Sequence, residues 1–205
     1  MVNTNSIKLN CIIVFILFIG SFAGCVKGSN YSKNIIEAKM FSEEQKQIVD
    51  LISTNEQKVL IFDFRTEDTY KNVDFWVETY NNGKLVDSRA AGTNVTYDDA
   101  KLLTGELAVT INQMPDYKWT LIYAEDKGYK GNNTSELNTN YNMVASAYCS
   151  MIQPVEIEDG KEIVLYACIF KQESKFETFD IQNFLDTNNL KEYEYAHIIK
   201  CKFSK

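Results

Sequence analysis

Residues 72 to 90 read N-V-D-F-W-V-E-T-Y-N-N-G-K-L-V-D-S-R-A and contain the clearest structural signal of the chain. The first half of this stretch alternates apolar and polar side chains, which is the period of a half-buried β-strand. Asn82-Gly83 then stands between two strand-like runs. Asn-Gly is the strongest short hairpin signal, because both turn residues need a positive φ. The sequence therefore predicts that 72–80 pairs antiparallel with 84–90.

The same two-residue period recurs along most of the chain. Further strands are predicted at 58–64, 106–112, 118–124, 142–152, 161–171 and 192–203. Asp159-Gly160 predicts a second hairpin turn. The run 162–170 is apolar on both faces, so both of its faces must be covered. Residues 125–139 are mostly polar and are expected to form a long loop.

A helix signal precedes the first of these strands. Ser42 is a good N-cap, and Gln45 completes a capping box with it. Apolar side chains recur on one face of the residues that follow, at Ile48 and Leu51. We expect a helix over 43–53 and place it as a cover for one face of the sheet.

These patterns together predict a mainly β fold. We expect an antiparallel β-sandwich or curled sheet of about seven or eight strands with one N-terminal helix. A second, short helix is expected near 179–185, and residues 42–205 are expected to form a single mostly-β domain.

The chain begins with an apolar run that ends near a cysteine. The run from Cys11 to Ile19 is shorter than the ~20 apolar residues that cross a bilayer. Small residues follow it, as in a secretory signal. The stretch Phe22-Ala23-Gly24-Cys25 resembles the lipobox of bacterial lipoproteins, with Phe22 where an aliphatic residue is commoner. The resemblance implies that 1–24 is a lipoprotein signal peptide and that the Cys25 thiol receives a diacylglyceryl group.

This resemblance also implies a cellular location. Two acyl chains hold a protein stably on a membrane surface, so the chain is expected at the extracytoplasmic face of a bacterial cell membrane. Residues 25–41 are expected to be the lipidated cysteine and a flexible tether, because the segment after Cys25 is polar and without periodicity. The alternatives are an uncleaved anchor and an ordinary signal peptide with a chance cysteine.

The charge of the chain limits its partners. The 205 residues carry a formal net charge of -7. Loss of 1–24 removes one lysine and no carboxylate, which leaves 181 residues with a net charge of -8. Nucleic-acid binding needs a basic patch or stripe, so no nucleic-acid partner is expected. A membrane-protein or cell-wall partner stays open.

Three cysteines remain after the signal and Cys25, and their spacing matches no zinc pattern. All three lie in strand-like runs, where a free cysteine behaves as a small hydrophobe. If the Asp159-Gly160 loop has two residues, Cys149 and Cys168 become diagonal neighbours on one sheet face. We expect three structural thiols, with a Cys149–Cys168 disulfide as the alternative that stays open; the third is Cys201.

No pattern in the sequence indicates a catalytic centre. His197 is the single histidine and lies in a strand-like run, where it is expected to be a satisfied core or edge residue. No nucleophile elbow, phosphate loop or EF-hand spacing occurs. The adjacent acids Asp98-Asp99 are expected in a loop or at a helix start. We therefore expect no catalytic residue, no metal site and no cofactor.

The aromatic content leaves one binding hypothesis. Trp76 and Tyr80 fall on the more polar face of their strand, and exposed aromatics there can stack on sugars or anchor a partner protein. The alternative is that another layer covers them. We favour a membrane-anchored binding or interaction module of unknown ligand. A spacer lipoprotein without a ligand and a carboxylate-based hydrolase are the alternatives.

Overall fold

The predicted hairpin is present and is longer than expected. In the computed structural model, β3 (Tyr70–Asn81) and β4 (Lys84–Lys101) pair antiparallel from Asn81 and Lys84 outward. The two turn residues have the positive φ that the Asn-Gly signal requires, 47° at Asn82 and 73° at Gly83. A second constraint holds at Gly83, because a Cβ there would lie 2.7 Å from Cγ of Lys191.

The structure describes residues 34–53, 57–112, 117–125, 128–137, 145–172, 176 and 180–205. The predicted signal peptide 1–24 and the lipidation site Cys25 lie outside these residues. No helix in the described part of the chain is long and apolar enough to cross a bilayer.

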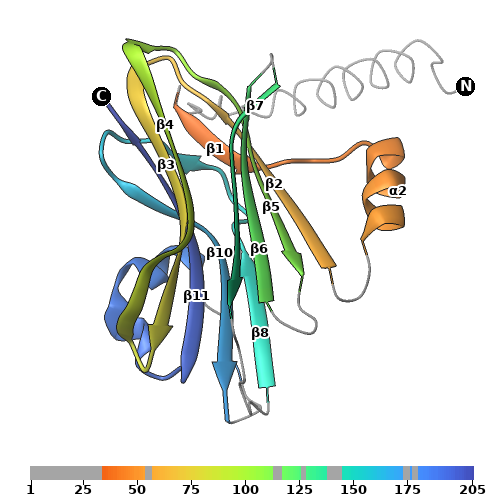
Figure 1. Cartoon of the computed structure of the whole chain (residues 1–205), viewed down its shortest axis with the longest axis vertical. Coiled ribbons are helices and arrows are strands. Elements are labelled where there is room, and N and C mark those ends of the chain that lie inside the picture. Colours follow the sequence, from red (N-terminus) through yellow and green to blue (C-terminus); the bar gives the residue numbers. More distant parts are fainter. Residues whose placement is uncertain are drawn as a thin grey trace, which may run out of the picture. The chain divides into compact units, whose positions relative to one another are not determined.

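The described strands form two antiparallel sheets (Figure 1). Sheet A has six strands in the order β7-β6-β5-β2-β1-β9, and sheet B has five in the order β4-β3-β11-β10-β8. Besides β3 and β4, the strands are β1 (Ile35–Ala38), β2 (Gln57–Arg65), β5 (Thr104–Asn112), β6 (Tyr117–Glu125), β7 (Gly128–Leu137), β8 (Ala145–Ser150), β9 (Val155–Glu156), β10 (Glu162–Lys171) and β11 (Tyr195–Ser204). The predicted β-sandwich with one N-terminal α-helix is confirmed.

The core lies between the sheets and follows the predicted alternation. Alternate residues in the middle of β5 and β6 face inward and are fully buried: Leu107, Val109, Ile111, Trp119, Leu121 and Tyr123. The facing layer comes from sheet B and includes Phe75, Val77, Ile199 and Phe203. Strand β4 packs against β6 and β7 and so joins the two sheets along one side.

Two segments without a predicted strand belong to sheet A. Strand β1 pairs with both β2 and β9, and Ile35 and Ile36 are buried. The tether predicted over 25–41 is therefore wrong for its last residues, because two adjacent isoleucines make 35–38 part of the core. The loop predicted over 125–139 is also wrong, because β7 pairs with β6 there. The segment is polar, so its sequence does not show the alternation of a half-buried strand, although it forms the edge strand of sheet A.

The pairing of β8 with β10 is present, but its register differs from the predicted one. Ala167 faces Cys149, and Cys168 faces Tyr148. Cys149 and Cys168 therefore lie on opposite faces of the sheet and are not joined by a disulfide. The Asp159-Gly160 turn does not join these strands; it follows β9 of sheet A and leads into β10 of sheet B. A register shift between Val164 and Tyr166 also changes the faces.

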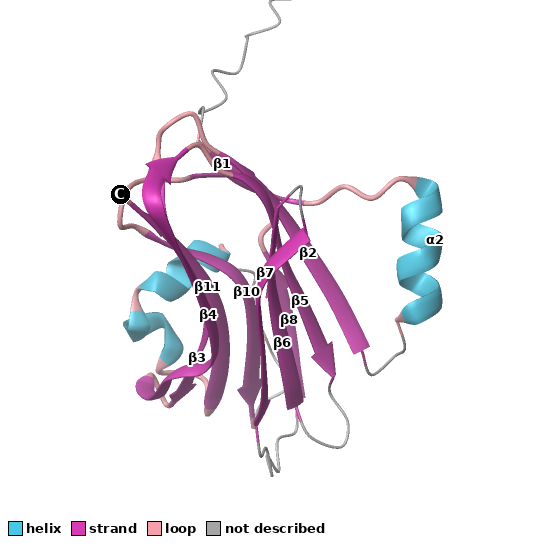
Figure 2. Cartoon of the chain, turned by 45° about the horizontal axis from the view of Figure 1, so that its top comes forward, coloured by secondary structure: helices cyan, strands magenta, loops and turns pink. Residues whose placement is uncertain are grey.

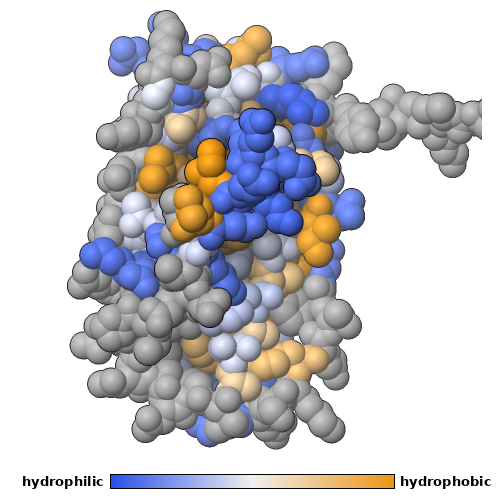
Figure 3. Space-filling view, turned by 90° about the vertical axis from the view of Figure 1, so that its right-hand side faces the viewer, coloured by the Kyte–Doolittle hydropathy of each residue, from blue (hydrophilic) through white to orange (hydrophobic). Residues whose placement is uncertain are grey.

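The predicted helix is α2 (Glu43–Ile52), and its capping box is present. Ser42 Oγ accepts from the Gln45 N–H, and Gln45 Oε1 accepts from the Ser42 N–H. The helix does not cover a sheet: Ile48 is 61% exposed and Leu51 is 85% exposed. Figure 2 draws it beside sheet A, and Figure 3 shows a hydrophilic outward face with apolar atoms along its flank.

The cover of sheet B comes instead from two 3-10 helices between β10 and β11. They are η1 (Ile181–Leu185), close to the predicted short helix, and η2 (Thr187–Leu190). Ile181, Phe184 and Leu190 are buried. The Gln182 amide donates to the Val164 carbonyl and accepts from the Val164 N–H, at 2.7 and 3.1 Å. It thus takes the place of a strand beside the part of β10 that β8 does not reach.

Candidate functional site

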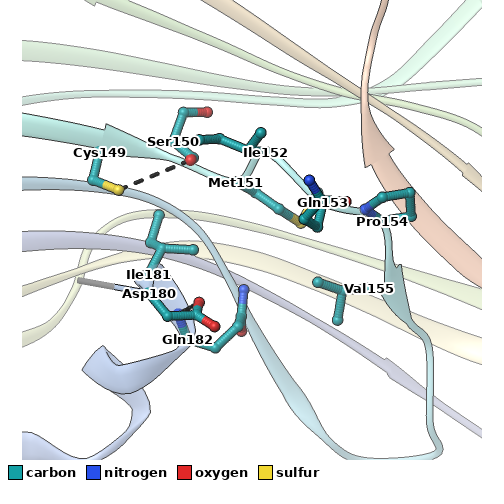
Figure 4. A pocket seen from close by; sticks show the side chains of 10 residues that line it. All are labelled: Cys149, Ser150, Met151, Ile152, Gln153, Pro154, Val155, Asp180, Ile181 and Gln182. Atoms are coloured by element: carbon teal, nitrogen blue, oxygen red, sulfur yellow. Dashed lines mark hydrogen bonds between the residues drawn. The ribbon is translucent and has the colours of Figure 1, made fainter. Parts of the chain in front are cut away.

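A pocket of about 380 Å³ lies where the chain crosses from sheet B to sheet A (Figure 4). One wall is the end of β8 with the turn that leads into β9, and the other is the start of η1. Its lining residues are Cys149, Ser150, Met151, Ile152, Gln153, Pro154, Val155, Asp180, Ile181 and Gln182. Most of these side chains are apolar, which is the usual character of a small-molecule site.

The strand ends explain why a pocket forms here. After β8, the Met151 N–H still bonds the Leu165 carbonyl of β10, and Val155 pairs with Ile36 of β1 in the other sheet. Pro154 has no N–H to donate, so it suits the step between the two sheets. The segment between Met151 and Val155 therefore belongs to neither sheet and forms one wall of the pocket, and η1 forms the opposite wall.

The pocket holds two groups with chemistry, Cys149 and Asp180. Asp180 Oδ1 caps η1 by accepting from the Gln182 N–H at 2.9 Å. Burial raises the pKa of the Cys149 thiol, and the negative charge of Asp180 raises it further. A raised thiol pKa leaves little thiolate at neutral pH, so the thiol is a poor nucleophile. The arrangement fits binding better than covalent chemistry.

Trp76 and Tyr80, predicted as an exposed binding pair, are buried. The indole Nε1 of Trp76 donates to Glu78 at 3.0 Å, and the hydroxyl of Tyr80 donates to Glu78 at 2.5 Å. Lys200 Nζ lies 2.7 Å from the same carboxylate. Burial opposes ionisation of Glu78, but these three partners hold its pKa below the ordinary value. The pair is part of a structural charge cluster, so the surface-stacking hypothesis is wrong for it.

His197 is a satisfied core residue, as expected. It is fully buried, and its Nδ1 lies 3.0 Å from the Thr79 hydroxyl oxygen. Burial lowers the His197 pKa to about 4. Asp98-Asp99 are exposed residues of β4 rather than of a loop or helix start. Among the described residues, no group of three or more histidine, cysteine, aspartate or glutamate side chains is placed to hold a metal ion.

The fold and the pocket define a class: an antiparallel β-sandwich domain with a ligand-sized apolar pocket at the crossing between its sheets. The chain belongs to the YgaN domain family, whose model matches residues 34–203. That match begins one residue before β1 and ends inside β11, so it spans both sheets and the pocket. No curated protein and no solved structure gives a significant match.

Sequence reasoning missed the pocket residues. The sequence predicts Cys149 as a core thiol or disulfide partner rather than as part of a pocket, and it does not single out Asp180. One signal was present in the sequence: Pro154 breaks the pairing of two apolar strands and forces a change of direction there. What lies opposite that break depends on where η1 packs, which is a tertiary contact.

Proposed function

We propose that the chain is a lipid-anchored binding module at the extracytoplasmic face of the cell membrane. Cys25 holds it there, and the pocket between β8 and η1 takes a small ligand. The lipobox-like Phe22-Ala23-Gly24-Cys25 supports the anchor, and the pocket supports the binding role. A spacer lipoprotein needs no pocket, whereas a volume of about 380 Å³ with apolar walls is in the range of small-molecule sites.

The lining selects a chemical class of ligand. Apolar side chains from the crossing segment and Ile181 fit an apolar body. The one charged group of the lining is Asp180, which is exposed and already caps η1 with one oxygen. A carboxylate accepts but does not donate hydrogen bonds. The fitting ligand is therefore an apolar molecule with one ammonium or other donor group.

Cys149 provides a direct readout of pocket occupancy. Cys168 and Cys201 are fully buried, and Cys149 is partly exposed. Methyl methanethiosulfonate should therefore modify Cys149 first in the folded domain. We expect 4-phenylbutylammonium to slow this modification in a saturable way, and 4-phenylbutan-1-ol to slow it less. Asp180→Asn keeps a capping side chain and removes the charge, so it should abolish the difference between the two probes.

Val155→Trp fills the pocket and should remove protection by both probes. Modification rates that neither probe changes would overturn the ligand part of the proposal and favour the spacer alternative. Protection that survives Val155→Trp would place the ligand elsewhere.

The anchor has its own test. Cells expressing the full chain are fed an alkyne-tagged fatty acid, and the label and the membrane fraction are measured. Cys25→Ser should lose both, while Cys11→Ser, a matched change inside the expected signal peptide, should keep both. Retention of label by Cys25→Ser would overturn the lipoprotein assignment and leave the pocket test untouched.

A further inference from the structure

A second set of polar groups lies on the other face of β8, between the sheets. In sheet A, register places Lys58, Ile111 and Trp119 in one row across β2, β5 and β6. In sheet B, Tyr148, Cys168 and His197 form a row across β8, β10 and β11. The two rows contact each other at both ends, where Lys58 meets Tyr148 and Trp119 meets His197.

The contacts between the two rows show how they face each other. Lys58 Nζ lies 3.3 Å from the centre of the Tyr148 ring, and the rings of Trp119 and His197 are 5.8 Å apart. Elsewhere the inward face of β2 carries Leu60, Phe62 and Phe64, so a lysine in this position breaks the apolar pattern.

Lys58 is a partly buried cation to which the described residues supply no carboxylate. Among the described residues it makes no ion pair, and its close partner is the face of the Tyr148 ring. Burial lowers the Lys58 pKa, and of the described groups only the Cys168 thiol acts in the opposite direction. A cation taken partly out of water gains when an anion comes beside it. Tyr148 is 37% exposed, so this position opens to solvent.

Tyr166 lies on the same inward face of sheet B as Tyr148 and carries a hydroxyl that needs an acceptor. Its ring lies 6.4 Å from both the Tyr148 and the Trp119 rings, on the inward face of sheet B. The residue is 2% exposed, and its hydroxyl has no hydrogen-bond partner in the part of the chain that the structure describes. Buried hydroxyls are almost always satisfied, and an unsatisfied one destabilises the fold. An acceptor at this position would remove that destabilisation.

We propose that Lys58 and Tyr166 form a binding site for the carboxylate of a small apolar acid, entered between β2 and β8. The carboxylate accepts from the Lys58 ammonium and from the Tyr166 hydroxyl. The Tyr148 and Trp119 rings contact the apolar body. This site lies on the opposite face of β8 from Cys149 and is independent of the function proposed above.

Octanoate and octanamide are the probes that test this site, because they differ only in the charged group. Calorimetry on the folded domain should give a dissociation constant for octanoate roughly tenfold lower than for octanamide, the usual gain of a charge-assisted hydrogen bond. Lys58→Met should remove that difference, and Lys58→Arg should keep most of it. Lys46→Met on α2 changes the net charge equally and should change nothing.

Tyr166→Phe provides a second variant with a distinct signature. It should weaken octanoate binding by roughly three- to tenfold without lowering the melting temperature, because the hydroxyl has no partner to lose. Equal binding of octanoate and octanamide, equal effects of Lys58→Met and Lys46→Met, or no saturable octanoate binding would each overturn the proposal. Val155→Trp should leave octanoate binding unchanged; a loss there would place octanoate in the other pocket and would also overturn it.

Discussion

The two helical regions of this chain differ in whether they pack against a sheet. Helix α2 has ten residues, a complete capping box and an amphipathic pattern, yet Ile48 and Leu51 remain exposed. The η1 and η2 helices have five and four residues and no long-range periodicity, yet they bury Ile181, Phe184 and Leu190. Local signals therefore predicted which segment is helical, but not which segment packs.

The difference comes from what each segment is attached to. Both helical regions join strands that pair with each other, α2 between β1 and β2 and the 3-10 helices between β10 and β11, so this pairing alone does not decide which region packs. η1 and η2 join β10 and β11, and Gln182 fixes them to the backbone of β10 through Val164. Two hydrogen bonds to one buried strand outweigh a longer amphipathic pattern.

The largest expected effect is on the packed region. Phe184 is fully buried and its ring contacts Tyr193 edge to face, 6.0 Å away. Phe184→Ala should lower the free energy of unfolding by about 3–5 kcal/mol, as for a phenylalanine removed from a core. Leu51→Ala on α2 should change it by less than about 0.5 kcal/mol. Urea denaturation of both variants tests the contrast, and equal losses would mean that α2 packs as η1 does.

Much of the fold followed from alternation, and what failed has physical reasons. Strands with one buried face, such as 106–112 and 118–124, were predicted correctly. β7 was missed because its side chains are polar, and β1 because four residues are too few to show a period. The β8–β10 register was wrong because a bulge near Leu165 and the crossing at Pro154 are set by tertiary packing.

The next largest effect should come from acid, which destabilises the domain through His197 on β11. Its pKa in the folded state is lowered to about 4 from an ordinary value near 6.5. Between these values the unfolded chain binds more protons, so stability is complete above about pH 6.5 and is lost as the pH falls toward 4. The loss should approach about 3 kcal/mol.

Denaturation midpoints between pH 7 and 4.5 measure this dependence. His197→Gln keeps a polar group beside Thr79 and should flatten it. A wild-type curve that is already flat in this range would show that the buried imidazole is not the titrating group. α2 contains no histidine, so hydrogen exchange within it should not follow the same curve.

Two glutamines test the same contrast, because both form hydrogen bonds to the backbone through the side-chain amide. Gln182 satisfies the N–H and the carbonyl of Val164, which is buried. Gln182→Ala should cost about 1–3 kcal/mol, the penalty for buried polar groups left unsatisfied. Gln45→Ala leaves the Ser42 N–H exposed to water, so it should lower the free energy of unfolding by only a small fraction of that amount. A similar loss in both variants would contradict the assigned difference in burial.

The candidate sites were harder to predict than the fold. Trp76 and Tyr80 sit on the more polar face of β3, and only the structure shows that Glu78 and Lys200 accompany them in a buried cluster. Lys58 sits next to an apolar run, but its position over Tyr148 depends on how two sheets face each other. Periodicity fixes the face of a strand, not its partner across the core.

The smallest expected effect is at the α2 cap, and it tests the independence of the helix most directly. Ser42→Ala removes the side-chain acceptor for the Gln45 N–H, and an N-cap serine is worth about 1 kcal/mol to its helix. Amide exchange in α2 should therefore quicken by roughly fivefold. Because the helix does not pack on a sheet, the urea midpoint of the whole domain should stay unchanged. If the midpoint falls by the same free energy as local exchange, then α2 unfolds only with the sandwich, and its exposed apolar face is coupled to the core after all.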